Sequence, residues 1–427
     1  MGDHTTGPES REASTVAAAQ GARSVHDADM PTLEVVDIDA GQDMRDRVRE
    51  LAADAWIVRG AFGYLIIRYD DVTAMLRDKR WHNAVAKLPE MMGITEPDDA
   101  GNNRVSILAT EGDMHTRLRR LVAKAFSPRA ADRLRPFMRE VVNDLVDNVA
   151  SSGRADVAVD ICEPYPIPII CELLGAPRTD WQLFSRWAED VVRIFSETAR
   201  DELDIIRQAQ SELDEYTRGL IAARRNDPRN DLITDLIAAE EAGDRLTTDE
   251  LVMMVNAVIV GGTDTTRNQL GCAVGLLSDH PDQWRLLADD PAIAPTAVEE
   301  TMRYFGAIRG TGRFASEDIV YRDLLFPAGT FVFPSLSAAN FDGGVFDQPD
   351  TLDITREPVK QHPQMTFGSG IHYCLGASLA RAELQEALPI LVRRMPDLRV
   401  DGTIEWKPQT TAIFGPAHLP VTFTPGH

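Results

Sequence analysis

The amino-acid sequence predicts a mostly helical protein with a small β subdomain, an α+β fold class in which helices and strands occupy separate stretches of chain. Long helical patterns fill the middle of the chain, and short alternating apolar stretches typical of strands lie towards both of its ends. Neither an internal repeat nor a Gly/Ser-rich linker divides the chain. We therefore expect a single large domain over residues 31–427, preceded by a disordered tail over residues 1–30, which are mostly polar and small.

Local signals place the individual elements. Ser127 followed by Pro128 is a helix start, and Thr247 with Glu250 forms a capping box before a long apolar segment. The expected helices cover residues 70–80, 136–149, 180–225, 251–277, 295–304 and 375–395. The expected strands, bounded by Gly, Pro or Asp turns, lie at residues 64–68 and within 313–335 and 399–423.

Charge and composition exclude several function classes. The chain has 44 basic and 67 acidic side chains and a net charge of −23, so phosphate backbones should repel it and nucleic acid is not an expected partner. No uninterrupted apolar run reaches the ~18 residues of a membrane span. Residues 1–30 also lack the apolar stretch of a signal peptide, and we expect a cytoplasmic protein.

The cysteines divide into two kinds. Cys162, Cys171 and Cys272 lie in apolar stretches and are expected to be unreactive core residues. Cys374 instead lies in the segment Phe367-Gly368-Ser369-Gly370-Ile371-His372-Tyr373-Cys374-Leu375-Gly376, directly before a helical pattern. Two glycines two residues apart imply tight backbone turns. A thiol at a helix N-terminus should have a lowered pKa and be held as a thiolate. The alternative is a buried core cysteine in a glycine-rich turn.

This segment resembles the haem-binding loop of cytochromes P-450, whose pattern Phe-Gly-x-Gly-x-His-x-Cys-x-Gly is matched at every fixed position. The resemblance extends over nearly the whole chain from about Pro31 and implies the cytochrome P-450 fold. It also implies Cys374 as the ligand of the haem iron, with Phe367, Gly368 and Gly376 as cofactor contacts. The cofactor would be haem b, bound non-covalently because no C-x-x-C-H motif for thioether attachment is present. A thiolate ligand favours cleavage of an O–O bond.

A second segment, Ala257 to Thr266, places two adjacent glycines, an acid and hydroxyls within an apolar helix. Each glycine costs about 1 kcal/mol relative to alanine in a helix, so a close approach to the backbone or a bulge is expected. The segment resembles the oxygen-activating motif of the same family. The resemblance implies Thr265 as the hydroxyl beside the dioxygen and Asp264 as the acid that relays protons from solvent. Alone, it could also be an ordinary helix with a polar patch.

Further resemblances concern haem binding and folding. Glu300 and Arg303 share a helix face and resemble the family's Glu-x-x-Arg pair, and Arg356 would complete a structural triad. The chain departs from the family where it has Phe341 in place of a common arginine, which puts a local ion pair in doubt. Cationic partners for the haem propionates are implied at His115, Arg119, Arg313 and His372. Taken singly, each of these could be a solvated surface charge.

The chain has no room for a flavin domain and no cysteine set for an iron–sulfur cluster, so electrons should come from a ferredoxin and a ferredoxin reductase. A basic stripe on this acidic protein is formed by Arg117, Arg120 and Lys124, which are spaced three and four residues apart. It lies on a different helix face from His115 and Arg119. This stripe is either an ordinary solvated helix face or the docking patch for an acidic ferredoxin.

The implied function is insertion of one oxygen atom from O2 into a small apolar organic molecule, with a steroid, terpenoid or polyketide all open. The resemblance implies a substrate pocket lined by Val258, Gly262, Ala307, Ile308 and Phe414. Two other functions compete: a peroxide-driven or oxygen-free haem-thiolate reaction without hydroxylation, and a haem-based ligand sensor. Neither gives Asp264 and Thr265 a role.

Overall fold

The computed structural model describes residues 21–33, 41–61, 63–91, 107–196, 198–241, 246–408 and 413–426. Of the tail expected over residues 1–30, the first twenty residues lie outside the described ranges. The remainder begins the fold earlier than expected, because Arg23–Ser24 forms strand β1 and Val25 is fully buried.

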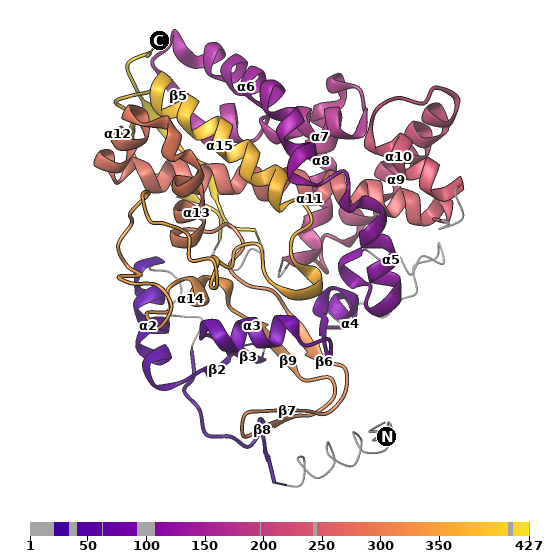
Figure 1. Ribbon diagram of the computed structural model, residues 1–427, viewed down its shortest axis with the longest axis vertical. Coiled ribbons are helices and arrows are strands. Elements are labelled where there is room, and N and C mark those ends of the chain that lie inside the picture. Colours follow the sequence, from indigo (N-terminus) through magenta and orange to yellow (C-terminus); the bar gives the residue numbers. More distant parts are fainter. Residues whose placement is uncertain are drawn as a thin grey trace, which may run out of the picture.

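Helices make up most of the described chain (Figure 1). Their bounds are α2 Gly41–Asp54, α3 Tyr69–Arg77, α4 Leu88–Met91, α5 Gly112–Ala123, α6 Pro128–Ala150, α7 Pro166–Leu174, α8 Trp181–Val192, α9 Leu203–Asn226, α10 Leu232–Glu241, α11 Thr248–Ser278, α12 Pro281–Asp289, α13 Ala294–Tyr304, α14 Leu336–Asn340 and α15 Ala377–Arg394. The 31-residue α11 crosses the middle of the helical layer and packs against α7, α8, α9, α13 and α15.

The predicted caps are confirmed, and one helix start is corrected. Thr247 Oγ1 accepts the N–H of Glu250, whose carboxylate accepts the N–H of Thr247 in return, so α11 begins with the predicted capping box. The helix expected from residue 136 already begins at Pro128, and Pro136 lies inside α6. The long helical patterns expected over residues 180–225 are confirmed as two helices, α8 and α9.

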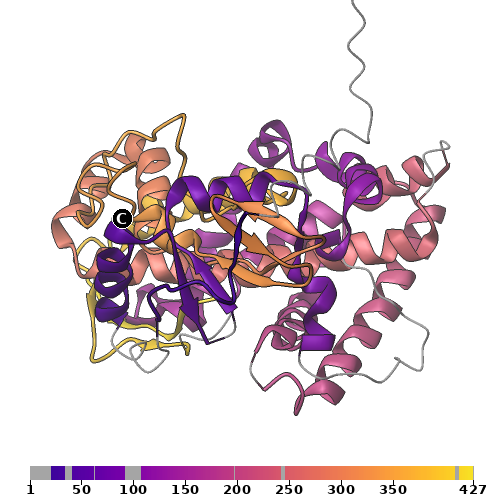
Figure 2. The ribbon, with the colours of Figure 1, turned by 90° about the horizontal axis from the view of Figure 1, so that it is seen from below.

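Strands form small sheets. The largest has five strands in the order β2-β3-β9-β6-β4, which span Ile57–Gly60, Gly63–Ile66, Phe331–Pro334, Arg313–Ala315 and Trp81–Asn83. The other strands are β5 Arg154–Asp156, β7 Ile319–Tyr321, β8 Leu324–Phe326, β10 Arg399–Val400, β11 Glu405–Trp406, β12 Pro416–His418 and β13 Pro420–Thr422. The five-stranded sheet lies at the lower end of Figure 1, and Figure 2 shows it from below with helices on both sides.

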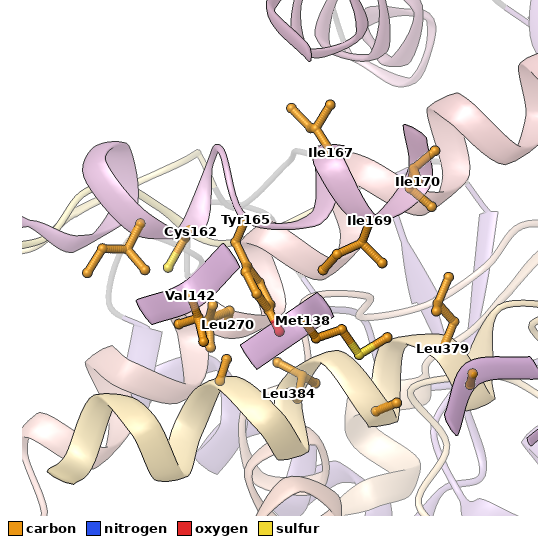
Figure 3. Close-up of a cluster of buried hydrophobic side chains, with 14 of the residues drawn as sticks. Met138, Val142, Cys162, Tyr165, Ile167, Ile169, Ile170, Leu270, Leu379 and Leu384 are labelled. Atoms are coloured by element: carbon orange, nitrogen blue, oxygen red, sulfur yellow. The ribbon is translucent and has the colours of Figure 1, made fainter. Parts of the chain in front are cut away.

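The main core lies where α6, α7, α11 and α15 meet (Figure 3). Tyr165 is fully buried there, and its hydroxyl donates to the carbonyl of Glu383 at 2.9 Å. Cys162, Cys171 and Cys272 are buried as predicted. Burial raises the pKa of the Cys162 thiol and raises that of Cys171 to about 12, so both stay protonated at neutral pH. In the part of the chain that the structure describes, no helix is long and apolar enough to cross a bilayer.

Candidate active site around Cys374

The loop that precedes α15 is shaped by glycines. Gly368 and Gly370 have φ angles of +70° and +73°, the left-handed region that glycine adopts without strain. A Cβ on Gly370 would lie 2.0 Å from the carbonyl oxygen of Leu76, so the loop passes directly against the end of α3. The tight turns expected from the sequence are present, and their glycines are required by geometry.

These turns place Cys374 two residues before Gly376, the N-cap of α15. The N–H of Cys374 donates to the carbonyl of Phe367 at 2.9 Å, and the N–H of Gly376 bonds to the sulfur. The Cys374 residue keeps some accessible surface. Desolvation of its sulfur is nevertheless the largest influence on the pKa of the thiol, and it raises that pKa. The Gly376 N–H and the charges of Arg119 and Arg381 act in the opposite direction.

The predicted lowering of the Cys374 pKa is therefore wrong in net direction, because desolvation outweighs the helix N-terminus. A bound metal cation is the partner that makes such a buried sulfur ionise, since a coordinating thiol is deprotonated outright. The donor set around Cys374 thus fits a metal-bound thiolate.

The cationic residues predicted to hold propionates converge beside this loop. His115 of α5 and Arg313 of β6 are each 3% exposed, and the rings of His115 and His372 lie 4.5 Å apart. Arg119 donates to the carbonyl of Tyr373. Burial, with the charges of His372 and Arg119, lowers the pKa of His115 to about 4.

Arg313 is buried and forms no ion pair among the described residues, although the charge of the Glu111 carboxylate acts on it. Its guanidinium donates to Thr311 Oγ1 at 2.8 Å and to the carbonyl of Gly312 at 2.9 Å. Burial lowers its pKa to about 10, which still leaves it charged at neutral pH. A buried cation of this kind is strongly destabilising unless an anion pairs with it. The carboxylates of a haem fit that requirement.

Sequence reasoning missed Glu111, the residue at the N-cap of α5. Its carboxylate accepts the N–H of Asn83 at 2.8 Å and lies 3.0 Å from Nε2 of His372. Burial raises the pKa of Glu111, but the bonds from His372 and Asn83 lower it further than burial raises it. The other ring nitrogen of His372, Nδ1, is buried and has no hydrogen-bond partner among the described residues. It is a second buried polar group that a propionate would satisfy.

The two glycines of α11 have different surroundings. A Cβ on Gly261 would meet no atom within 4 Å, whereas one on Gly262 would lie 2.4 Å from Cδ1 of Ile170 in α7. Gly262 therefore lets two helices pack closely, and its place in the substrate pocket stays a prediction. Gly261 is the glycine with open space, and its carbonyl accepts the hydroxyl of Thr265 at 2.9 Å.

Asp264 and Thr265 are not joined to each other. Asp264 is 2% exposed and accepts from Nε of Arg267 at 2.6 Å, with Nζ of Lys407 at 4.0 Å. Arg267 in turn lies 3.9 Å from the carboxylate of Glu163, whose side chain is partly exposed. Asp264 thus belongs to a buried ion-pair network that leads through Arg267 towards the surface. The local sequence does not reveal this network.

The structural triad is assembled as expected. Glu300, 2% exposed, accepts from Nε of Arg303 at 2.7 Å and lies 3.1 Å from Nε of Arg356. Phe341 departs from the family pattern, and the guanidinium of Arg303 lies 5.5 Å from its ring centroid. Phe341, which replaces a common arginine of the family, therefore makes a cation–π contact with Arg303.

Other predicted pocket residues are covered. Ala307 and Phe414 are 1% and 2% exposed and pack with Cys272 in a cluster, so their side chains do not line an open surface. Val258 is 6% exposed, and Ile308 is partly exposed. Val258, Ala307 and Phe414 are thus buried, whereas Gly262 and Ile308 keep partial exposure, and the predicted pocket lining stays a prediction.

The basic stripe of α5 is also modified. Arg117 forms an ion pair with Glu250 in the first turn of α11, so its charge is used within the protein. Arg120 and Lys124 are exposed on the same helix or at its C-cap. The docking patch expected at Arg117, Arg120 and Lys124 stays a prediction, with the charge of Arg117 paired to Glu250.

Comparisons with known proteins give a consistent result. A family model described as Cytochrome P450 matches residues 173–288 and 293–403. The chain is 38% identical over 366 residues to nocardicin C N-oxygenase of Nocardia uniformis subsp. tsuyamanensis, covering 84% of this chain and 89% of that one. It is 36% identical over 370 residues to mycinamicin IV hydroxylase/epoxidase of Micromonospora griseorubida, covering 85% and 90%.

Solved structures agree with these relatives. The crystal structure of CalO2 superposes with a TM-score of 0.86 at 32% identity, covering 93% of this chain and 100% of that one. P450BioI in complex with an acyl carrier protein gives a TM-score of 0.82 at 31% identity over 90% of this chain and 99% of that one. The chain therefore belongs to the cytochrome P450 family and is a monooxygenase that carries a thiolate-ligated protohaem and uses O2 to oxidise an organic substrate.

Proposed function

We propose that this cytochrome P450 inserts one oxygen atom from O2 into a small apolar organic molecule, with Cys374 as its iron ligand and with electrons from a separate ferredoxin and reductase. The observation that carries the proposal is that two buried nitrogen groups lie beside the Cys374 loop. The Arg313 guanidinium forms no ion pair, and Nδ1 of His372 has no hydrogen-bond partner, among the described residues. Sulfur on one side and cations beside it form a site for a metal porphyrin with two carboxylates.

The haem, when bound, supplies cleavage of the O–O bond, which a thiolate ligand favours. The protein's part is to hold it: Cys374 by its sulfur, and Arg119, Arg313, His115 and His372 by charge-assisted hydrogen bonds. Phe367 and Gly376 bond to the cysteine, and Gly368 shapes the loop through its left-handed backbone. Glu111 joins this set as the partner of the second His372 nitrogen.

Proton delivery falls to α11. The hydroxyl of Thr265 both donates and accepts, and in the structure it donates to the Gly261 carbonyl beside open space. Asp264 is held by Arg267, so we propose that its carboxylate leaves this pair to relay a proton to Thr265. Glu163, on the far side of Arg267, connects the network to solvent.

The substrate is proposed to be an apolar natural product. Val258 and Ile308 supply apolar lining. Among relatives, the polyketide biosynthesis cytochrome P450 PksS of Bacillus subtilis is 34% identical. This name favours a polyketide over a steroid or a terpenoid.

We further propose that an acidic ferredoxin docks on the exposed cations of α5, Arg120 and Lys124, in the cytoplasm. These cations share their helix with His115 and Arg119, so the docking face would lie close to the haem. Charge reversal at Lys124 should weaken ferredoxin binding most at low ionic strength, since screening removes such contacts in salt. Equal binding of the variant and the parent at low salt would contradict this assignment.

The proposal is tested by the absorbance spectrum of the reduced carbon monoxide complex. The parent protein should show the long-wavelength Soret band of a thiolate-ligated haem, and Cys374→Ser should lose it. A Cys374→Ser protein that retains its haem and its turnover would refute the ligand assignment. Ferric spin-state changes on addition of polyketides, steroids and terpenoids then rank the substrate classes.

The competing functions are separated by coupling measurements. Thr265→Ala should consume electrons without forming product, whereas Thr265→Ser, which keeps the hydroxyl, should remain coupled. A peroxide-driven enzyme or a ligand sensor would show no difference between these variants. Unchanged coupling in Thr265→Ala would therefore refute the proton-delivery role.

A further inference from the structure

We propose that Arg381, oriented by Glu299, is a positioning residue for the thiolate loop: it clamps the Phe367 ring and the Tyr373 hydroxyl and supplies a positive charge that raises the reduction potential of the haem. This inference rests on the proposed ligation of haem by Cys374. Neither Arg381 nor Glu299 belongs to the sequence motifs described above.

The first contact fixes the arginine to α13. Nε and Nη2 of Arg381 donate to the two carboxylate oxygens of Glu299, the second at 3.0 Å, in a fork-to-fork arrangement. The side chains are 25% and 18% exposed, so the pair is shielded from much of the solvent. Gln364 donates to the same carboxylate at 3.2 Å. Such bidentate geometry holds the plane of the guanidinium as well as its charge.

The second set of contacts reaches the cysteine loop from both flanks. The guanidinium lies 4.4 Å from the centroid of the Phe367 ring, and Nη1 donates to the Tyr373 hydroxyl at 3.1 Å. Phe367 is also the residue whose carbonyl accepts the N–H of Cys374. Arg381, on the second turn of α15, therefore holds both Phe367, whose carbonyl bonds to the cysteine backbone, and Tyr373, which directly precedes the cysteine.

The charge of Arg381 also lies beside the cysteine loop, because its guanidinium contacts Phe367, which bonds to the Cys374 backbone, and Tyr373, which directly precedes the cysteine. The same charge stabilises the ferrous state, which carries one more negative charge on the iron–thiolate unit than the ferric state. Loss of the charge should therefore lower the reduction potential.

Adjacent residues of α13 thus have separate tasks. Glu300 holds Arg303 and Arg356, which tie α13 to the segment near residue 350. Glu299 holds Arg381 and so ties α13 to α15 and the thiolate loop. This division explains why the same helix turn carries two acids in succession.

The test compares Arg381→Gln, Arg381→Lys and Glu299→Gln with the haem-loaded parent protein. Arg394→Gln is the matched control, because Arg394 also forms an ion pair from α15, with Asp147 at 2.6 Å, but in the last turn of that helix. The measurements are the reduction potential, the rate of haem transfer to an acceptor protein, and the thiolate Soret band of the reduced carbon monoxide complex.

Arg381→Gln should show a lower reduction potential, haem transfer about tenfold faster and a weakened thiolate band, in the range that outer contacts of metal ligands usually contribute. Arg381→Lys should restore the potential but not haem retention, since an ammonium cannot reproduce the fork and the stacking. Glu299→Gln should not lower the potential, because it keeps the arginine charge and removes a negative one, but it should lose haem faster. Because it retains the arginine, it tests the clamp even if Arg381→Gln fails to fold.

The inference is overturned if Arg381→Gln has the potential and the haem retention of the parent, or if Arg394→Gln shifts both as much. It is also overturned if Glu299→Gln retains haem like the parent. Absence of the thiolate band in the parent itself would instead refute the ligand assignment, so the two failures are distinguishable.

Discussion

Replacement of Glu300 by glutamine removes a buried negative charge that two arginines share. The carboxylate is 2% exposed and receives bonds from Arg303 at 2.7 and 2.8 Å, from Arg356 and from the N–H of Asp353 at 3.1 Å. The glutamine amide keeps the shape but leaves the buried Arg303 without its counter-charge. Breaking a buried ion pair from one side costs about 3–5 kcal/mol, and that is the expected loss in the free energy of unfolding.

The assay is urea unfolding followed by circular dichroism, with haem at the same saturating concentration for each protein, because a ligand bound to the native state shifts apparent stability. The matched control is Glu50→Gln. Glu50 pairs with Arg47 at 3.2 Å, but the two side chains are 68% and 47% exposed, and a pair of this kind contributes about 0–1 kcal/mol. If Glu300→Gln lost no more stability than Glu50→Gln, the structural role of the triad would be refuted.

Three further outcomes are expected. Gly370→Ala should abolish the thiolate Soret band with little change in helix content, because its Cβ would lie 2.0 Å from the Leu76 carbonyl at a φ of +73°; a normal band would contradict the loop geometry. Thr247→Ala should cost about 1 kcal/mol in urea unfolding through loss of a cap, and an unchanged midpoint would show that the capping box contributes nothing. His115, whose burial lowers its pKa from 6.5 to about 4, takes up a proton in the unfolded chain before it does in the folded one. The haem-free protein should therefore lose stability as pH falls from about 6.5 to 4, and His115→Gln should flatten that decline; an identical pH profile for both proteins would exclude His115 as its source.

Features that depend on neighbouring residues in the chain could be predicted from the sequence. The capping box at Thr247 and the turns at Gly368 and Gly370 are local, because their partners lie within a few residues or their backbone angles suit glycine alone. Helix bounds were less certain. Pro136 reads as a helix start, but it lies inside α6, where preceding residues already form the helix.

Features that depend on distant parts of the chain could not be predicted. Glu111 meets His372 across 261 positions, and Glu299 meets Arg381 across 82, so no local pattern marks them. The close approach of Gly262 to Ile170 could not be predicted for a related reason, because the resemblance gives a position along α11 but not the identity of the neighbour.

The pairing of strands has a consequence for biosynthesis. β5, near residue 155, bonds to β13 only through Val421 and its neighbours, and β1 pairs in parallel with β8 some three hundred positions later. β1 must wait for β8, and β5 must wait for β13, before they can pair, since such long-range pairings close late. The thiolate loop is synthesised between β8 and β13. A ribosome that stalls before Cys374 would therefore release a colourless chain in which β5 lacks its partner strand.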